Sequence, residues 1–290
     1  MLIREIASPV HFVSVVAKKM PTQLRVETFL ISQKNPYKHR NLALYKAPYV
    51  KLNANPLVTN NFPKNHIRIE LMKILTWNIE RPKAENQFIL DKLAEYNAEI
   101  VILTETNSII KLGKEYSFVA TESLINGYDG IQYKTGENRT TIWTKYKIGI
   151  QQETYDSFTS VCAQIETPNG LLNVYGTIIG VFGGIGERFK SDLENQILDF
   201  ENLSTESSIC IVGDFNVTFS GRVYPSHDAR NKLNLVFEKL ELINLTSEIE
   251  NNVDHIVLSK SYMENKKVKI ETWNLDKKLS DHIGVCLTLE

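Results

Sequence analysis

Carboxylate and amide side chains recur where apolar segments of this sequence end. Asn78 and Glu80 follow a first segment, Glu105 closes a second, and Asp214 and Asn216 close a third in the run Gly-Asp-Phe-Asn. Oxygen donors of this kind suit Mg²⁺ or Mn²⁺ better than zinc. A divalent cation would also offset the repulsion among carboxylates held close together. We therefore predict a divalent-metal site built from strand ends.

Two Asp-His pairs follow near the C-terminus. Asp254 and His255 begin the apolar run "DHIVLS", and Asp281 and His282 precede the last apolar run. An imidazole changes charge near neutral pH, and a carboxylate neighbour favours its charged form. Each of these residues alone is explained as simply by a turn or a surface loop, and Gly213–Asn216 also fits a β-turn. Their repeated position at strand ends favours a functional site.

These side chains need a scaffold that brings distant strand ends together. The run "LMKILTWN", a helix over 84–97 and the run "EIVILTET" predict a β–α–β unit, and "TPNG" joins two strands into a hairpin. Further helices are predicted over 187–203 and after Asp228, which would cap the second of them. Three closing strands are "VDHIVLS", "KVKIETW" and "HIGVCLTLE". Strands dominate, with about three helices, so we predict an α/β fold with two sheets packed face to face and helices outside.

Composition divides the chain into two unlike parts. The 290 residues are 42% hydrophobic and 23% charged, which excludes collagen-like, disulfide-scaffold and wholly disordered classes. Residues 1–70 hold 11 Lys and Arg against 3 Asp and Glu, six of the nine prolines and no glycine, whereas residues 71–290 hold 22 against 31. We predict an acidic domain over 71–290, long enough for a substantial core, and a basic extension over 1–70.

The extension has little hydrophobic periodicity. Residues 32–65 are rich in Asn, Pro and Lys, and only short pieces such as residues 23–31 resemble strands. We predict that residues 1–70 are disordered or loosely packed. The alternative is a basic arm that binds nucleic acid. Met72 opens "MKILTWNIERP" and also fits a translation start, so detection of native peptides before Met72 would test whether the extension belongs to the mature protein.

Cysteine usage and hydropathy bear on the compartment. Cys162, Cys210 and Cys286 are far apart and form no Cys-x-x-Cys pattern, which predicts buried, reduced thiols. No apolar run reaches the roughly 18 residues that a transmembrane helix needs. The early run "HFVSVVA" is too short for a convincing signal peptide. We therefore expect a cytoplasmic protein without a membrane partner, and a monomer.

The ordered set of motifs over residues 72–290 resembles the endonuclease/exonuclease/phosphatase superfamily. The family's opening strand ends in an Asn, as "ILTWNIE" does at Asn78, and its next element ends in a metal-binding Glu, as "VILTET" does at Glu105. The family's central GDFN is present unaltered at Gly213–Asn216. Its late Asp matches Asp254, and its terminal Ser-Asp-His matches residues 280–282. The resemblance implies a DNase I-like α/β sandwich of two sheets with flanking helices.

The same resemblance implies roles for the matched residues. Glu105 would be the main Mg²⁺ ligand, with Asn78 and Asp281 near the metal, and Glu80 would help through water. His282 would pair with Asp254. Asn216 would hold a phosphate oxygen, and Asp214 would orient or deprotonate the attacking water. Whether Asp214 or His282 is the base stays open. The chemistry is phosphodiester hydrolysis by in-line attack, with Mg²⁺ or Mn²⁺ as cofactor.

The chain departs from the family's pattern at one strand. Ile178 stands where many members carry a His or Tyr ring, and alternation turns Tyr175 to the opposite face. Arg188, after the glycine-rich segment 180–186, is a candidate phosphate-binding residue, as is Arg139, although both also fit ordinary surface positions. The glycine-rich segment lacks the Lys-Ser/Thr of a P-loop, and we predict a mobile loop at the site rim.

Two classes of function remain. The first is a Mg²⁺-dependent phosphodiesterase, with a nuclease as the family's default and a small phosphorylated metabolite as the alternative substrate. The acidic domain is short for the family, carries a net charge of -9 over residues 71–290 and has no Arg just before Asp254, all of which disfavour a tight grip on duplex DNA. The second class is a binding module that keeps the fold without turnover. The intact Glu105, Asp214 and His282 disfavour that class.

Overall fold

The structure is a computed structural model, and it describes two parts of the chain separately. Described are residues 15–20, 23–28, 71–82, 86–124, 131–180, 186–205 and 207–290. Residues 1–64 and 65–290 form separate units. In the first unit, β1 (Val15–Met20) pairs antiparallel with β2 (Gln23–Thr28). The predictions for the rest of the basic extension, and for most of the glycine-rich segment, fall on residues outside the described ones.

The second unit contains two six-stranded sheets. The first, called the β3 sheet, runs in the order β13 (Val268–Trp273), β14 (Gly284–Leu289), β3 (Met72–Asn78), β4 (Ile100–Asn107), β6 (Glu137–Thr144), β5 (Ser117–Ala120). The second, called the β10 sheet, runs in the order β11 (Leu242–Asn244), β12 (Asp254–Ser259), β10 (Ser208–Asp214), β9 (Gly170–Ile178), β8 (Ser160–Thr167), β7 (Lys147–Gln152). The expected two-sheet α/β sandwich is confirmed.

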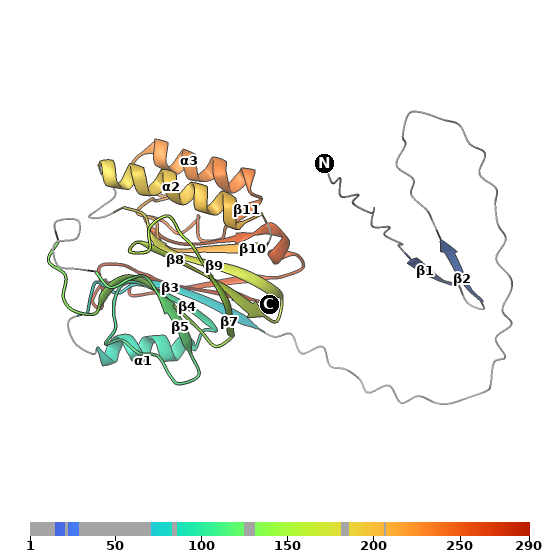
Figure 1. The fold of residues 1–290 in the computed structure, drawn as a ribbon, viewed down its shortest axis with the longest axis horizontal. Helices are drawn as coiled ribbons and strands as arrows, with labels where there is room; N and C mark the ends of the chain where they lie inside the picture. Colours follow the sequence, from blue (N-terminus) through green and yellow to red (C-terminus); the bar gives the residue numbers. More distant parts are fainter. Residues whose placement is uncertain are drawn as a thin grey trace, which may run out of the picture. The chain divides into compact units, whose positions relative to one another are not determined.

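Apolar side chains on alternating strand positions join the two sheets. Ile74, Ile102 and Ile142 of the β3 sheet share one buried cluster with Val174 and Val212 of the β10 sheet. The strands alternate, so the opposite face of each sheet needs its own cover. Helices supply that cover, and the domain is layered helix, sheet, sheet, helix (Figure 1).

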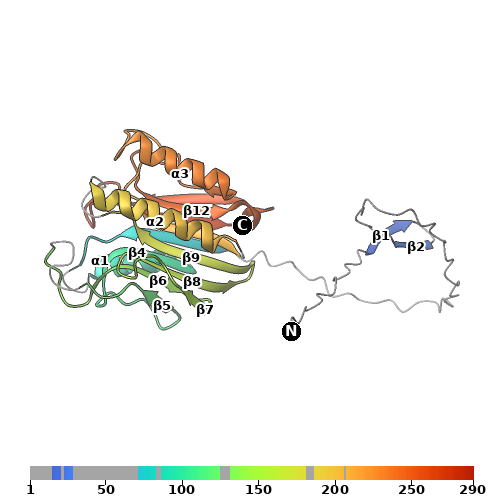
Figure 2. The ribbon, with the colours of Figure 1, turned by 45° about the horizontal axis from the view of Figure 1, so that its top comes forward.

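Three α-helices lie on the outer faces in the described part of the domain. α1 (Gln87–Tyr96) covers the β3 sheet, while α2 (Glu187–Leu203) and α3 (His227–Lys239) lie side by side over the β10 sheet (Figure 2). The helix predicted over 84–97 begins only at Gln87, because Asn86 caps it by accepting a hydrogen bond from the Ile89 amide.

The cap predicted for the third helix was wrong. Ser226, not Asp228, precedes α3, and its hydroxyl accepts a hydrogen bond from the Ala229 amide. Asp228 lies in the first turn instead, where a carboxylate is still favoured by the helix dipole. The predicted β–α–β unit and hairpin are confirmed, since β3 and β4 pair in parallel and β8 and β9 pair antiparallel.

The cysteine prediction is confirmed, because Cys162, Cys210 and Cys286 are all buried and unbridged. Within the described residues, none of the helices combines the length and the hydropathy that crossing a bilayer requires. Tyr175 also points as predicted, away from the inter-sheet core. Its ring packs edge-on against Phe200 of α2, and its hydroxyl donates a hydrogen bond to Asp199 at 2.7 Å.

Candidate active site

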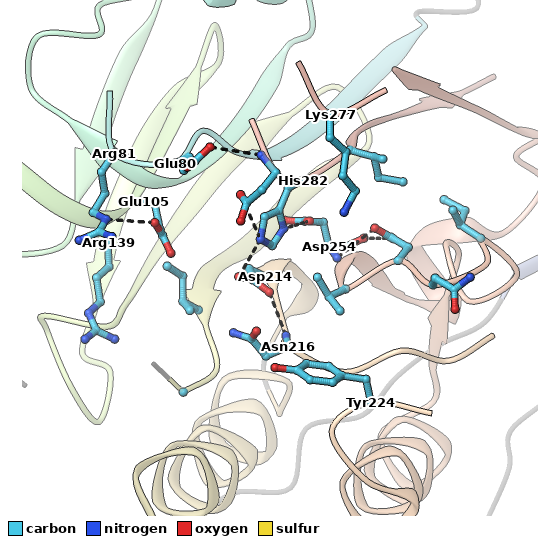
Figure 3. Close-up of a pocket in the computed structure, with 18 of the residues that line it drawn as sticks. Glu80, Arg81, Glu105, Arg139, Asp214, Asn216, Tyr224, Asp254, Lys277 and His282 are labelled. Atoms are coloured by element: carbon cyan, nitrogen blue, oxygen red, sulfur yellow. Dashed lines mark hydrogen bonds and ion pairs between the residues drawn. The ribbon is translucent and has the colours of Figure 1, made fainter. Parts of the chain in front are cut away.

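The site lies where strand ends from both sheets meet. β3 and β4 run in parallel toward it, and so do β9 and β10, while β12 starts there and β14 starts just beyond Ser280–His282. In open α/β sheets, ligands bind in the crevice beyond the carboxyl ends of the strands. The resulting cavity is about 720 Å³ in volume. Figure 3 shows the side chains that converge on it.

Three titratable groups form a tight cluster in the middle of this cavity. His282 Nδ1 lies 2.6 Å from Asp254 Oδ2, and His282 Nε2 lies 4.0 Å from Asp214 Oδ2. Asp214 and Asp254 face each other across the antiparallel β10–β12 pair, and both are buried. The cluster therefore holds two buried carboxylates against one imidazole, which contacts them from the other sheet.

This cluster shifts the pKa values of its members. Burial raises the pKa of Asp214 to about 7, with the His282 charge opposing the rise and the Asp254 charge adding to it. For His282, burial by itself lowers the pKa, but the carboxylates of Asp254 and Asp214 outweigh burial and raise the pKa to about 10. At neutral pH the imidazole is thus a proton donor, and Asp214 titrates in the range that suits a general base.

One neutral side chain and one backbone amide orient Asp214 from two directions. Asn78 Nδ2 donates to Asp214 Oδ2 at 3.2 Å, and the Asn216 amide donates to Asp214 Oδ1 at 2.9 Å. Asn78 Oδ1 accepts from the Glu80 amide at 3.0 Å, so both ends of this amide side chain are engaged. Asn78 lies beneath the cavity rather than among its lining residues, whereas Asn216 lines it. In this arrangement Asn78 holds the carboxylate of Asp214.

A second group of charged side chains lines the neighbouring part of the cavity. Glu105 Oε2 accepts from Arg81 Nε at 3.2 Å, and the side chains of both residues are 34% exposed. Glu80 Oε2 accepts from the Asp281 amide at 3.3 Å. Asp281 Oδ1 lies 3.8 Å from His282 Nε2. Glu80, Glu105 and Asp281 thus bring three carboxylates to the cavity, which is also lined by the guanidinium groups of Arg81 and Arg139 (Figure 3).

Backbone strain concentrates at the same strand ends. Glu80, Arg81, Glu105 and Asn216 all adopt left-handed φ angles, between 46° and 54°. Non-glycine residues reach this region at a cost, and they cluster at functional sites more than elsewhere. Gly213 has a φ of 138°, and a Cβ there would lie 2.0 Å from the Thr177 carbonyl oxygen. The glycine of the GDFN motif is therefore required by close packing of β10 on β9.

The remaining candidate residues differ in whether they line the cavity. Ile178 lines the cavity, as does Arg139, whose Nη2 lies 3.5 Å from the Tyr133 hydroxyl. Arg188 does not line it. The guanidinium of Arg188 binds Asp156 and Asp192, each at 2.7 Å. Arg188 thereby serves the attachment of α2 and stays out of the cavity.

His255 is a structural residue. Its Nε2 donates to the Val217 carbonyl oxygen at 2.9 Å, and its Nδ1 lies 3.0 Å from Thr246 Oγ1. Burial lowers the pKa of His255 to about 4, although its backbone partners and Asp254 oppose that change. The imidazole is therefore neutral in the folded protein, and of the two Asp-His pairs only the second contributes its histidine to the cavity.

One group of the described residues has ligand atoms close enough together to hold a metal ion. Ligand atoms of Asp214, Asp254 and His282 lie within 4.8 Å of one another. The raised pKa of His282 keeps this imidazole protonated, which opposes direct coordination. The carboxylates of Glu105 and Asp281, called the oxygen-only set, line the same cavity. Oxygen ligands of this kind suit a hard divalent cation. Glu105 already binds a cationic group there, the Arg81 guanidinium, so this position fits a cation.

Several cavity residues were not singled out from the sequence. Arg81, Tyr224, Leu275 and Lys277 all line the cavity. Arg81 lies three residues after Asn78, so its place beside the first strand end was available as a signal. Lys277 lies only four residues before Asp281, but its loop had no distinguishing pattern in the sequence.

The comparison with protein families decides the membership. The model of the Endonuclease/Exonuclease/phosphatase family matches residues 75–282, which include every residue of the cluster and of the oxygen-only set. The chain belongs to the endonuclease/exonuclease/phosphatase family. A search among curated proteins finds no match.

Solved structures of the family share the fold. They include an AP endonuclease from Archaeoglobus fulgidus, with 16% identity and a TM-score of 0.56, covering 74% of this chain and 98% of that one. A 3'-5' exonuclease from Neisseria meningitidis has 15% identity, a TM-score of 0.56 and the same coverages. The catalytic domain of human Nocturnin has 14% identity and a TM-score of 0.56, covering 77% and 94%. Two of these three structural neighbours are named as nucleases.

Proposed function

We propose that this chain is a Mg²⁺-dependent hydrolase of phosphodiester bonds, and within that class a nuclease. The observation that carries the proposal is the His282–Asp254–Asp214 cluster, which lies beside the oxygen-only set of Glu105 and Asp281 in one cavity. This arrangement provides a proton donor, a proton acceptor and a cation site within reach of one phosphate group. Family membership supports the same class of reaction.

Each residue of the site has a separate role in the proposed reaction. A divalent cation held by Glu105 and Asp281 would supply the electrostatic stabilisation of charge that develops on the phosphoryl and leaving oxygens. Asp214, fixed by Asn78 and by the Asn216 amide, accepts the proton of the attacking water. His282 is already charged, so it donates a hydrogen bond to a phosphoryl oxygen rather than acting as the base.

Asn216 and Asp254 complete the arrangement. Asn216 Nδ2 donates to the Ile179 carbonyl oxygen at 3.1 Å, which leaves its second amide hydrogen for a phosphate oxygen. Asp254 keeps His282 charged and holds the orientation of its ring. Ile178 brings no donor, so this chain would bind the phosphate without the ring that many family members place there.

A metal-dependence assay tests the proposal. Wild-type protein would be incubated with a generic aryl phosphodiester and with labelled single- and double-stranded DNA and RNA, in Mg²⁺, Mn²⁺ or EDTA. We expect cleavage with Mg²⁺ and none with EDTA. Glu105→Gln and His282→Gln should each lower kcat by about a hundredfold or more. The matched control is Glu238→Gln, an exposed residue of α3, which should leave kcat unchanged.

Activity that survives EDTA and both substitutions would refute the mechanism. The pH profile gives an independent check, because the rate requires Asp214 without its proton and His282 with its proton. The rate should rise as pH passes the value of about 7 for Asp214 and fall near the value of about 10 for His282. A profile that falls through neutral pH would reverse the assigned roles.

A small phosphorylated metabolite is the second candidate substrate. The cavity of about 720 Å³ has the size of a small-molecule site, and apolar residues such as Leu124, Ile131 and Ile249 share its walls with the charged groups. Cleavage of the aryl phosphodiester without cleavage of any nucleic acid would favour this candidate. Loss of all turnover, with phosphate binding retained, would favour a binding module of the same fold.

A further inference from the structure

The loop between β13 and β14 projects into the cavity next to His282. Its residues 274–281 follow Trp273, which is buried and stacks on Tyr96 with ring centroids 4.4 Å apart. At the other end, Ser280 Oγ donates to the Asn78 carbonyl oxygen at 2.5 Å. Both ends of the loop are therefore attached to buried parts of the β3 sheet.

One side chain inside the loop fixes its shape. Asn274 Nδ2 donates to the carbonyl oxygens of Ser280 and His282, both at 2.7 Å, and Asn274 Oδ1 accepts from the Leu279 amide at 3.0 Å. Asn274 and Lys277 have left-handed φ angles of 58° and 54°. The loop is thus held in one conformation by the same contacts that hold the backbone of His282.

The residues at the tip of this loop differ in what they bind. Lys278 Nζ forms an exposed ion pair with Asp276 Oδ2 at 2.6 Å, so its charge is balanced by a neighbour. Lys277 lines the cavity and makes no ion pair with the rest of the described chain. Leu275 also lines the cavity, with 71% of its surface exposed. The tip of the loop thus presents one cation and one apolar side chain to the cavity, and Asp281 lines the cavity at the end of the loop.

Lys277 lies on the opposite side of the His282 ring from Arg81 and Glu105 (Figure 3). Under the proposed function, the scissile phosphate lies between His282 and Glu105, which both line the cavity. A cation beyond His282 is therefore placed for a second negative charge, carried by the part of the substrate that extends past the reacting bond. An exposed leucine next to it offers an apolar surface that can pack on a sugar or base face.

We propose that Lys277 and Leu275 form a subsite for the nucleotide next to the scissile phosphate. Lys277 binds the neighbouring phosphate, and Leu275 packs on the sugar or base attached to it. The inference rests on the proposed function and makes it more specific. It selects a substrate with at least two consecutive phosphates, such as an oligonucleotide, over an isolated phosphodiester.

Two substrates separate this subsite from the reaction centre. A labelled single-stranded oligonucleotide has a neighbouring phosphate, whereas bis(4-nitrophenyl) phosphate has none. We expect Lys277→Gln to lower kcat/KM on the oligonucleotide by about tenfold, mainly through KM, and by several times less on the small diester. Lys277→Arg should restore most of the loss, because it keeps the charge. Lys278→Gln is the matched control, since its charge is already paired with Asp276.

Leu275→Ser should also raise KM selectively for the oligonucleotide. Binding measured by fluorescence anisotropy over a salt series provides a readout that needs no turnover. Loss of one phosphate contact in Lys277→Gln should reduce the slope of log affinity against log salt by about 0.7 to 1. A matching loss in Lys278→Gln would contradict the subsite.

Failure of the subsite and failure of the proposed function give different results in these assays. Equal losses on both substrates for Lys277→Gln, or no loss on either, would overturn the subsite and leave the hydrolase intact. Wild-type cleavage of the small diester but not of the oligonucleotide would do the same. Wild-type inactivity on both substrates in Mg²⁺ would overturn the proposed function, and the subsite with it.

Discussion

Replacing Asp254 with Asn removes the charge closest to His282 while keeping the size of the side chain. His282 Nδ1 lies 2.6 Å from Asp254, against 4.0 Å and 3.8 Å from Nε2 to Asp214 and Asp281. At about 1.4 kcal/mol for each pH unit, the rise of the His282 pKa from 6.5 to about 10 corresponds to about 5 kcal/mol in favour of the imidazolium. The contact distances assign the largest part of this energy to Asp254.

We therefore expect Asp254→Asn to lower the pKa of His282 by about two pH units or more, since an opposite charge in contact moves a pKa by roughly one to three units. Heteronuclear NMR of the imidazole nitrogens over a pH series measures this directly in the metal-free protein. The control is Asp281→Asn, because Asp281 is 68% exposed and screened by water. Its substitution should change the pKa of His282 by less than about half a unit.

The same substitution predicts a change in stability with a defined sign. The pKa of His282 is raised by folding, so the pair stabilises the folded state fully below pH 6.5 and loses this effect as pH rises through about 10. Asp254→Asn should be destabilised most at neutral and lower pH, with the gap to wild type narrowing toward pH 10. A His282 pKa in Asp254→Asn within about half a unit of wild type would refute the reasoning.

Three further substitutions test other features. His255→Gln removes a buried neutral imidazole whose pKa of about 4 lies below the ordinary 6.5, so wild-type stability is lost as pH falls from 6.5 through 4. The variant should lose less stability than wild type across that window in urea denaturation, and an unchanged slope would contradict this. Arg81→Gln removes the cation that binds Glu105, and calorimetric titration with Mn²⁺ should show several-fold tighter binding, whereas equal or weaker binding would argue against competition between guanidinium and metal. Gly213→Ala places a Cβ 2.0 Å from the Thr177 carbonyl oxygen and should lower the free energy of unfolding by about 3 kcal/mol or more, measured by thermal denaturation, unlike Gly170→Ala, whose Cβ meets no atom within 4 Å. Similar losses in both glycine variants would show that the left-handed φ, rather than the close contact, limits this position.

The order of motifs in the sequence was sufficient to predict the fold and most of the cluster. Asp214, Asp254 and His282 each stand at the boundary of a strong apolar strand, and local alternation together with the family's order predicts that such boundaries meet. The cap of α3 was misplaced by two residues because Ser226 and Asp228 satisfy the same local rule. Local rules of this kind do not decide between neighbouring candidates.

Long-range partners were harder to predict. Arg188 follows a glycine-rich segment and begins a helix, which is a reasonable place for phosphate binding. Its actual partners, Asp156 and Asp192, lie 32 residues away and one helical turn away, and nothing in the sequence marked Asp156 as a partly buried acceptor. Lys277 was missed for a different reason. Its proposed role depends on the ion pair between its neighbours Lys278 and Asp276, which leaves Lys277 as the unpaired lysine of the two within the described chain, and no sequence pattern predicted that ion pair.

The two sheets contribute different halves of the cluster. Asp214 and Asp254 belong to the β10 sheet, while His282 precedes a strand of the β3 sheet. The 2.6 Å contact between His282 and Asp254 therefore spans the seam between the two layers, as does the Asn78–Asp214 hydrogen bond, whereas the core between the sheets is apolar. Sliding of one layer by about 1 Å would stretch the His282–Asp254 contact beyond hydrogen-bond distance before any strand is lost. Turnover should therefore depend on the alignment of the two sheets. As hydrostatic pressure rises, the reaction rate should fall at a lower pressure than the circular dichroism signal does.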